Sequence, residues 1–159
     1  MIVSARKEGT MRGYFGIGIY SPKNEVNIGG LWRSAYIFGA AFIFTVGRRY
    51  HRQASDTICA PRHIPLLNYL TYDDFREHQP SDCQVICVEN NNGAASLVGF
   101  HHPERAIYLL GAEDNGIPSK ILERHQSVII ESSQPYSLNV ATAGTIVMYD
   151  RFTKRKETK

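Results

Sequence analysis

The sequence predicts a single α/β domain in which helices flank a mostly parallel β-sheet. The run 42–47, FIFTVG, is continuously apolar and of strand length, which is typical of a strand buried on both faces of a parallel sheet. A helical pattern lies between the strand-like run 14–20 and this second run, so the three segments form a βαβ unit. The length of 159 residues and the hydrophobic content of 43% suit one domain of this class.

Composition divides the chain into three parts. Residues 1–13 are polar and basic without periodicity, and we interpret them as a mobile N-terminal arm. Residues 14–153 make up the single domain, and residues 154–159 form a basic tail. This tail carries four cations and one acid, which accounts for the formal net charge of +3. The body is then close to neutral, so net charge alone does not argue for a nucleic-acid partner.

Several protein classes are disfavoured by what the sequence lacks. No apolar run approaches the roughly 20 residues needed to cross a bilayer. The start, MIVSARKEG, has no apolar core of the kind found in signal peptides. These observations predict a cytoplasmic protein without membrane segments. The three cysteines, Cys59, Cys83 and Cys87, stand at no recognisable zinc spacing and are odd in number, so we expect reduced thiols and no metal site.

The first helix follows the turn-forming residues 21–24, and Asn27 is expected to cap it. Its apolar positions fall at i, i+3, i+4 and i+7 and form one stripe that faces the sheet: Ile28, Leu31, Trp32 and Ala35. Arg33 lies about 140° around the helix from the first of these residues, so its side chain can point toward a cleft or into solvent. A solvated surface arginine is the alternative interpretation.

A basic cluster follows the apolar strand 42–47 at the end where parallel strands open into a crevice. Three guanidiniums there can bind phosphates bidentately, and Tyr50 could stack on a base. We therefore predict RNA binding by Arg48, Arg49 and Arg52. The alternative is a solvated charged loop. The following residues, 53–65, are interpreted as a flexible lid over the crevice.

The middle of the chain alternates short strands and helices. Thr71 is expected to open a brief helix, because Asp73 and Asp74 follow it in the first turn. Adjacent histidines, His101 and His102, point in different directions in a strand or loop, which disfavours a metal role. The predicted segments are a strand at 64–70, a helix at 72–78, a strand at 84–90, a loop or irregular crossover at 94–103, a strand at 106–110, a helix at 118–124 and a strand at 127–130.

The stretch 109–118, LLGAEDNGIP, joins an apolar strand to a turn rich in glycine and acidic residues. The carboxyl ends of parallel strands are where ligand crevices open, and glycines let the backbone approach a ligand closely. This stretch therefore predicts the mouth of a ligand site. The alternative is an ordinary strand-to-helix turn, with Pro118 in the first helical position.

The last helix is predicted over residues 138–152, and its first half has almost no polar face. A helix that is apolar all round must be covered on more than one side. Ala141, Ala143 and Gly144 would allow another backbone to approach closely. We therefore expect a homodimer formed through the last helix.

Three stretches, NIGGLWRSAYIFG (27–39), LLGAEDNGIP (109–118) and SLNVATAG (137–144), resemble the signature motifs of the SpoU/TrmH family of RNA 2′-O-ribose methyltransferases in the SPOUT superfamily. The resemblance covers about residues 14–151, and the chain looks like a minimal, single-domain member. It implies a C-terminal deep trefoil knot, a homodimer and S-adenosylmethionine held in the knot. On this sequence the cofactor pocket would include Leu110, Gly111, Ile130, Leu138 and Asn139.

The resemblance also implies a catalytic set. The position of Arg33 matches the arginine to which the family assigns activation of the ribose hydroxyl. Asn27 would brace the first motif, and Glu113 would orient the arginine or a catalytic loop. Ser137 and Asn139 would complete the site, although the same residues could simply cap the last helix. The sequence departs from the family at residues 131–135, where an acid, Glu131, follows the last strand.

The leading hypothesis is an S-adenosylmethionine-dependent RNA 2′-O-ribose methyltransferase that needs no metal and acts on tRNA, with rRNA as the alternative substrate. A second hypothesis is a knotted dimer that binds RNA without catalysis. A third is a flavodoxin-like nucleotide-binding domain, which would not explain the apolar last helix. An ordinary Rossmann methyltransferase is disfavoured, because no GxGxxG fingerprint follows the first strand.

Overall fold

Seven parallel strands form one sheet in the part of the chain that the computed structural model describes, residues 13–48, 62–112 and 114–157. The strand order is β3-β2-β1-β6-β4-β7-β5, and each neighbouring pair is parallel. The mostly parallel α/β sheet predicted from the sequence is thus confirmed. The strands are β1 (Phe15–Tyr20), β2 (Phe42–Val46), β3 (Leu66–Tyr69), β4 (Gln84–Val88), β5 (Ala95–Ser96), β6 (Ala106–Gly111) and β7 (Gln126–Ile129).

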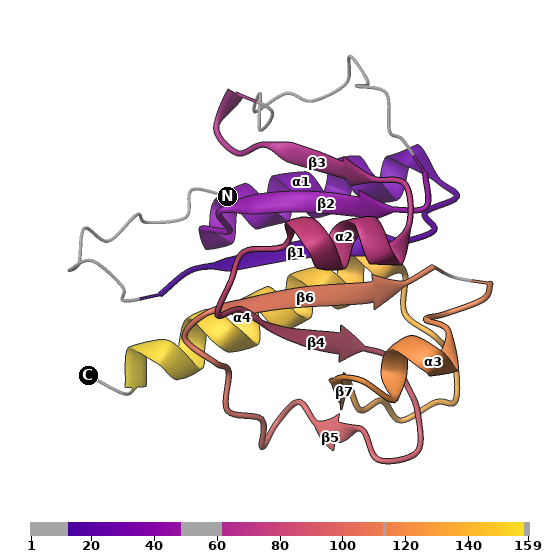
Figure 1. Cartoon of the computed structure of the whole chain (residues 1–159). Coiled ribbons are helices and arrows are strands. Elements are labelled where there is room, and N and C mark those ends of the chain that lie inside the picture. The colour runs from indigo at the N-terminus through magenta and orange to yellow at the C-terminus, as the bar shows by residue number, and fades with distance from the viewer. Residues whose placement is uncertain (1–12, 49–61, 113, 158–159) are drawn as a thin grey trace.

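Helices cover both faces of this sheet (Figure 1). The face with α1 and α4 buries Ile17, Tyr108 and Leu110, whereas the face with α2 and α3 buries Phe44 and Leu109. Because alternate residues of β6 belong to the two different cores, this strand is buried on both sides. The helices are α1 (Glu25–Phe38), α2 (Tyr72–His78), α3 (Ser119–Leu122) and α4 (Val140–Glu157).

Helix α1 carries the predicted apolar stripe, and all four of its residues are buried. The predicted cap is wrong. Asn24, whose backbone is extended, accepts a hydrogen bond from the backbone N–H of Val26 at 2.9 Å and so caps the helix. Asn27 lies inside the first turn and is buried. Helix α2, by contrast, begins as predicted, with the side chain of Thr71 accepting from the backbone N–H of Asp74.

Helix α4 begins two residues later than predicted and continues to Glu157, into the predicted tail. The start is fixed by Asn139, whose Oδ1 accepts from the backbone N–H groups of Ala141 and Thr142. A Cβ at Gly144 would lie 2.4 Å from Leu31 Cδ1, so this glycine lets α4 approach α1 of the same chain. The space beside Gly144, which was predicted to receive a second subunit, is therefore filled by Leu31 of the same chain.

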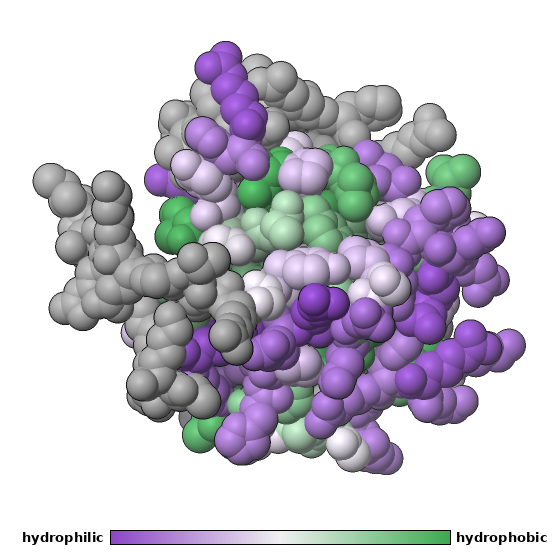
Figure 2. Space-filling model, turned by 60° about the vertical axis from the view of Figure 1, so that its left-hand side comes forward, coloured by the Kyte–Doolittle hydropathy of each residue, from purple (hydrophilic) through white to green (hydrophobic). Residues whose placement is uncertain are grey.

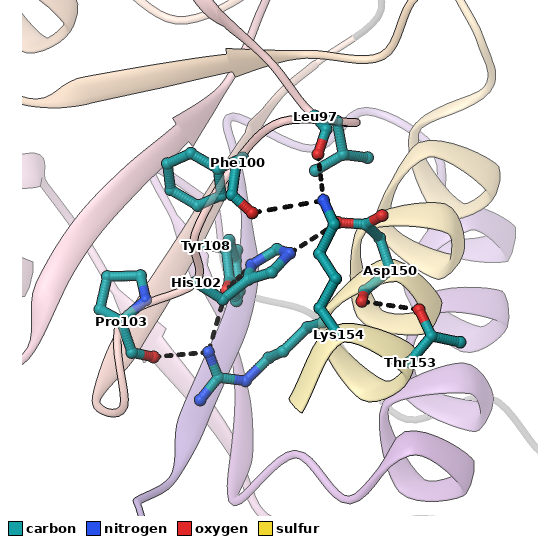
Figure 3. A network of polar contacts seen from close by, with 9 residues as sticks. Leu97, Phe100, His102, Pro103, Tyr108, Asp150, Thr153 and Lys154 are labelled. Carbon is teal, nitrogen blue, oxygen red and sulfur yellow. Dashed lines mark hydrogen bonds and ion pairs between the residues drawn. The ribbon is translucent and has the colours of Figure 1, made fainter. Parts of the chain in front are cut away.

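Polar contacts fasten the second half of α4 to the segment that leads into β6 (Figure 3). His102, with only 1% of its side chain exposed, lies 2.5 Å from the hydroxyl of Tyr108 through Nδ1 and 2.8 Å from Asp150 Oδ2 through Nε2. Burial lowers the pKa of His102, although Asp150 opposes this effect. Lys154 pairs with the same carboxylate. The segment 94–103, predicted to be a loop or an irregular crossover, carries the short strand β5 and a structural histidine.

Arg151 is the other centre of this network and is only 3% exposed. Its guanidinium donates to the backbone oxygens of Pro103 and Glu104 at 2.6 and 2.8 Å and to the Tyr108 hydroxyl at 3.2 Å. It also lies over the ring of Phe15, 5.0 Å from the centroid. This side chain therefore joins α4, β6 and β1 at the end of the sheet where these strands begin.

The surface of the described residues is mixed in character. Figure 2 shows mainly hydrophilic side chains over the lower half of the view and a group of hydrophobic side chains above them. No helix in the described ranges is long and apolar enough to cross a membrane.

Candidate functional site

A cavity of about 630 Å³ opens at the carboxyl ends of β4, β6 and β7. The ends of these strands supply apolar walls, including Leu110 and Val128, and the segment between β7 and α4 closes the other side. A pocket of this size and position is where ligands bind in open α/β sheets. Its lining residues include Val88, Glu89, Asn90, Leu110, Gly111, Ala112, Gly116, Val128 and Ile130, together with residues 131–138.

The turn after β6 has little room for side chains. A Cβ at Gly111 would lie 2.3 Å from Glu89 Oε2 and 2.8 Å from the backbone of Gly116. Gly116 itself adopts a φ of +58°, a conformation that glycine tolerates best. Both glycines therefore let the turn lie against the carboxylate of Glu89. Residues 110–112 and Gly116 of the predicted ligand mouth line the cavity.

Glu89 is a wall residue that the sequence reasoning missed. It follows β4 directly, and its Oε2 accepts from the backbone N–H of Ile117 at 3.0 Å. Its Oε1 accepts from the backbone N–H of Asn90 at 3.2 Å. An acid at the end of a predicted buried strand was the available signal, since that is the end at which the crevice opens.

Glu89 and Glu131 are the charged residues in the described wall of the cavity, and no lysine, arginine or histidine belongs to it. The wall thus favours a ligand with positive charge. Beneath the wall lies Cys87, whose pKa is raised to about 12, mainly by burial and to a lesser extent by the negative charge of Glu89. This thiol therefore stays protonated and is a poor nucleophile. Across the described ranges, no three His, Cys, Asp or Glu side chains are placed to hold a metal ion.

A side-chain hydrogen bond joins the starts of α1 and α4 beside the cavity. Asn139 Nδ2 donates to Asn27 Oδ1 at 2.8 Å, so two predicted catalytic residues lie together. Both residues also have a structural place, because Asn139 caps α4 and Asn27 lies in the first turn of α1. A small hollow next to them is lined by Asn27 and shares Ala112 and Val140 with the main cavity. The pair therefore borders the cavity without lining it.

The other predicted residues fall into three groups. Five of them line the cavity: Leu110, Gly111, Ile130, Ser137 and Leu138. Arg33 is exposed on α1 and does not line the cavity, and Arg48 is exposed just after β2. Three further candidates, Glu113, Arg49 and Arg52, lie outside the residues that the structure describes, as does most of the predicted lid at 53–65.

Comparison with known proteins identifies one family model that covers most of the chain. The model of the SpoU rRNA Methylase family matches residues 15–149. The mouse tRNA (guanosine(18)-2′-O)-methyltransferase TARBP1 is 29% identical over 140 residues, which cover 78% of this chain and 8% of that protein. The chain thus spans a small fraction of the length of this curated relative.

Solved structures show the same fold. A structure described as giving insights into the 2-OH methylation of C/U34 on tRNA has a TM-score of 0.77, with 23% identity and 94% of both chains covered. The TrmH/SpoU tRNA modifying enzyme of A. aeolicus has a TM-score of 0.80 with 17% identity, covering 91% of this chain and 76% of that one. An AdoMet-bound rRNA methyltransferase from Sinorhizobium meliloti has a TM-score of 0.79 with 20% identity, covering 90% and 57%.

Proposed function

The chain belongs to the SpoU rRNA methylase family, and from this premise we propose that it transfers the methyl group of S-adenosylmethionine to a ribose 2′-oxygen of RNA. The observation that carries the proposal is the cavity at the ends of β4, β6 and β7. Its wall contains five of the residues that the family resemblance places in the site.

The residues of the cavity fit the cofactor. The volume of the cavity lies in the range of sites that bind small molecules such as S-adenosylmethionine. Leu110, Ile130 and Leu138 offer apolar surface for an adenine ring, and Gly111 lines the same cavity. S-adenosylmethionine carries a net positive charge, which suits a wall with two acids and no described base. We therefore assign four wall residues, Leu110, Gly111, Ile130 and Leu138, to cofactor binding. Asn139, which borders the cavity without lining it, is assigned with them because it caps the helix that follows the wall.

When bound, the cofactor supplies a methyl group activated by the positive charge on sulfur, so no metal is needed. The protein must align the ribose hydroxyl with that group and stabilise charge on its oxygen. A guanidinium stays protonated at neutral pH and is a poor base. We therefore propose that Arg33 holds the ribose and its phosphate and stabilises the developing alkoxide. Asn27 and Asn139 brace the starts of the two helices, while Ser137 and Glu113 complete the site.

The side chain of Arg33 is exposed in the part of the chain that the structure describes. It lies on one exposed face of α1 with Val26, Gly30 and Ile37, at i, i+4, i+7 and i+11. Val26 and Ile37 are 68% and 56% exposed, an unusual state for large apolar side chains. We propose that a second copy covers this face and the adjoining α4, from which Tyr149 projects with 57% exposure. A homodimer of this kind would enclose Arg33.

We also propose that the chain is knotted, because of the path that it takes after β6. The turn after β6 and the segment from β7 to α4 wall the same cavity, although β4 lies between β6 and β7 in the sheet. The chain must return from β7 across the strand ends to place α4 on the face that α1 covers. A trefoil knot formed by residues after β6 would bring these two segments together.

We propose tRNA as the substrate, because a solved relative concerned with tRNA matches this chain over 94% of both lengths. Ribosomal RNA remains the alternative, given the rRNA methyltransferases of the same fold. Arg48, which is exposed where β2 ends, with Arg49 and Arg52 would bind RNA phosphates.

Changing these three arginines together to alanine should weaken RNA binding at least about tenfold near 0.1 M salt. The slope of log affinity against log salt concentration should fall by about 2 to 3, as expected when two to three phosphate contacts are lost. Filter binding at several salt concentrations measures both quantities. A variant with Arg76, Lys120 and Arg124 changed to alanine, all exposed cations of the α2 and α3 side, is the control. Equal RNA binding by the two variants would refute the assignment.

Gly111→Ala should lower the affinity for S-adenosylmethionine at least about tenfold, since overpacking of this kind costs about 1–3 kcal/mol. The new Cβ would press on the Glu89 carboxylate and on backbone atoms of Gly116, so the cavity wall must shift. Gly99→Ala is the matched control, because a Cβ there meets no atom within 4 Å. Isothermal titration of both variants measures the effect, and an unchanged affinity for Gly111→Ala would argue against this wall as the cofactor site.

The experiment that tests the proposed function is calorimetric titration of the purified protein with S-adenosylmethionine and with its demethylated product, followed by methyl transfer to tRNA and rRNA. We expect one site per subunit and a dimer by sedimentation. Absence of binding for both ligands would reject the methyltransferase and favour a knotted dimer that binds RNA without catalysis.

A further inference from the structure

The carboxylate of Glu89 is held in a fixed place in the cavity wall. The backbone N–H groups of Asn90 and Ile117 each donate to one of its oxygens. The Cα atoms of Gly111 and Gly116 pack against Oε2, since a Cβ on Gly111 would lie 2.3 Å and one on Gly116 2.7 Å from this oxygen. The group is thus positioned before any ligand arrives, which reduces the cost of ordering it on binding.

Glu89 also keeps the capacity to accept further hydrogen bonds. A carboxylate offers about four acceptor sites, and the two backbone donors use one on each oxygen. The residue lines the cavity and is half-buried, so a ligand hydroxyl can reach it while solvent is partly excluded. A donor group of the ligand that faces this point would form a charge-assisted hydrogen bond, which is stronger than a neutral one.

We propose that Glu89 recognises the ribose hydroxyls of the cofactor's adenosine, an inference that rests on the proposed function. Two oxygens of a carboxylate match two neighbouring hydroxyls. An acid at the carboxyl end of a strand accepts ribose hydroxyls in the same way in dinucleotide-binding α/β domains. Apolar wall residues close to Glu89, Leu110 and Val128, are suited to the adjoining adenine. Glu131, the other acid, lies in the exposed segment and is less well placed to select a ligand.

The test compares S-adenosylhomocysteine with its counterpart lacking both ribose hydroxyls, by calorimetry on the full-length purified protein. The unmodified protein should bind the dideoxy ligand about 10- to 100-fold more weakly, as expected for loss of hydrogen bonds to a charged group. Glu89→Gln should bind S-adenosylhomocysteine about 10-fold or more weakly. The same variant should show a much smaller difference between the two ligands than the unmodified protein shows.

Two controls separate recognition from a structural role. Glu131→Gln removes an equal charge from the exposed part of the wall, and about a threefold loss or less is expected because solvent screens it. Thermal unfolding of Glu89→Gln reports whether the turn at Ile117 survives. If the dideoxy ligand binds the unmodified protein as tightly as S-adenosylhomocysteine does, the inference is wrong whatever the variant does.

The outcomes also distinguish this inference from the proposed function. An equal loss for both ligands in Glu89→Gln would overturn ribose recognition and leave the methyltransferase in place, since such a loss indicates a bracing or general electrostatic role. If the unmodified protein bound neither S-adenosylmethionine nor S-adenosylhomocysteine, both the proposed function and the inference would fall.

Discussion

Replacing Arg33 with alanine is expected to lower the rate of methyl transfer about 10²- to 10³-fold, the usual effect of removing one donor that stabilises a developing oxyanion. The fold and the cofactor affinity should change little, because the side chain is exposed on α1 and does not line the cavity. Single-turnover transfer from labelled S-adenosylmethionine measures the rate, and titration and thermal unfolding measure the other two properties.

The matched control is Arg76→Ala, an exposed arginine on α2 at the opposite face of the sheet, which should keep full activity. Arg33→Lys should recover little of the loss, since an ammonium cannot hold ribose and phosphate with the planar fork of a guanidinium. Unchanged transfer by Arg33→Ala would remove this residue from the mechanism.

Replacing Arg151 with alanine is expected to lower the free energy of unfolding by about 3–5 kcal/mol. The change leaves the backbone oxygens of Pro103 and Glu104 and the hydroxyl of Tyr108 without this donor, and it empties the space over the ring of Phe15. Urea denaturation followed by circular dichroism measures the loss.

Arg155→Ala serves for comparison. Arg155 also donates to the backbone oxygen of Glu104, at 3.0 Å, but in an exposed setting, so we expect a loss of less than about 1 kcal/mol. If Arg151→Ala were destabilised no more than Arg155→Ala, the buried network would contribute little to stability.

The strands and the stripe of α1 could be predicted because their signals are local. The run 42–47 is apolar throughout, and β2 is buried at every position. The cap of α1 could not be predicted in this way, because Asn24 and Asn27 are the same residue type three positions apart. The two asparagines differ in their partners: Asn24 caps the helix, whereas Asn27 accepts a hydrogen bond from Asn139, a residue far along the chain.

The site shows the same division between local and distant information. The turn that holds Gly111 is visible in the sequence, and in the structure this glycine lies against Glu89 and Gly116. Glu89 was missed, since an acid after a strand looks like any solvated residue until Gly111, Gly116 and Ile117 are brought against it. Likewise, the sequence predicts a contact of Gly144 with a second subunit, whereas in the structure Leu31 of the same chain lies against this glycine.

The strand order of the sheet has a consequence for how the chain is made. β1 pairs with β6 along its full length, from Phe15 opposite Ala106 to Tyr20 opposite Gly111. During synthesis on the ribosome, β2, β3, β4 and β5 all emerge before β6 does. Until then one edge of β1 stays open, and unpaired edges can recruit strands from other nascent chains. We therefore expect a cell to need chaperone assistance for this chain mainly before β6 has left the ribosome.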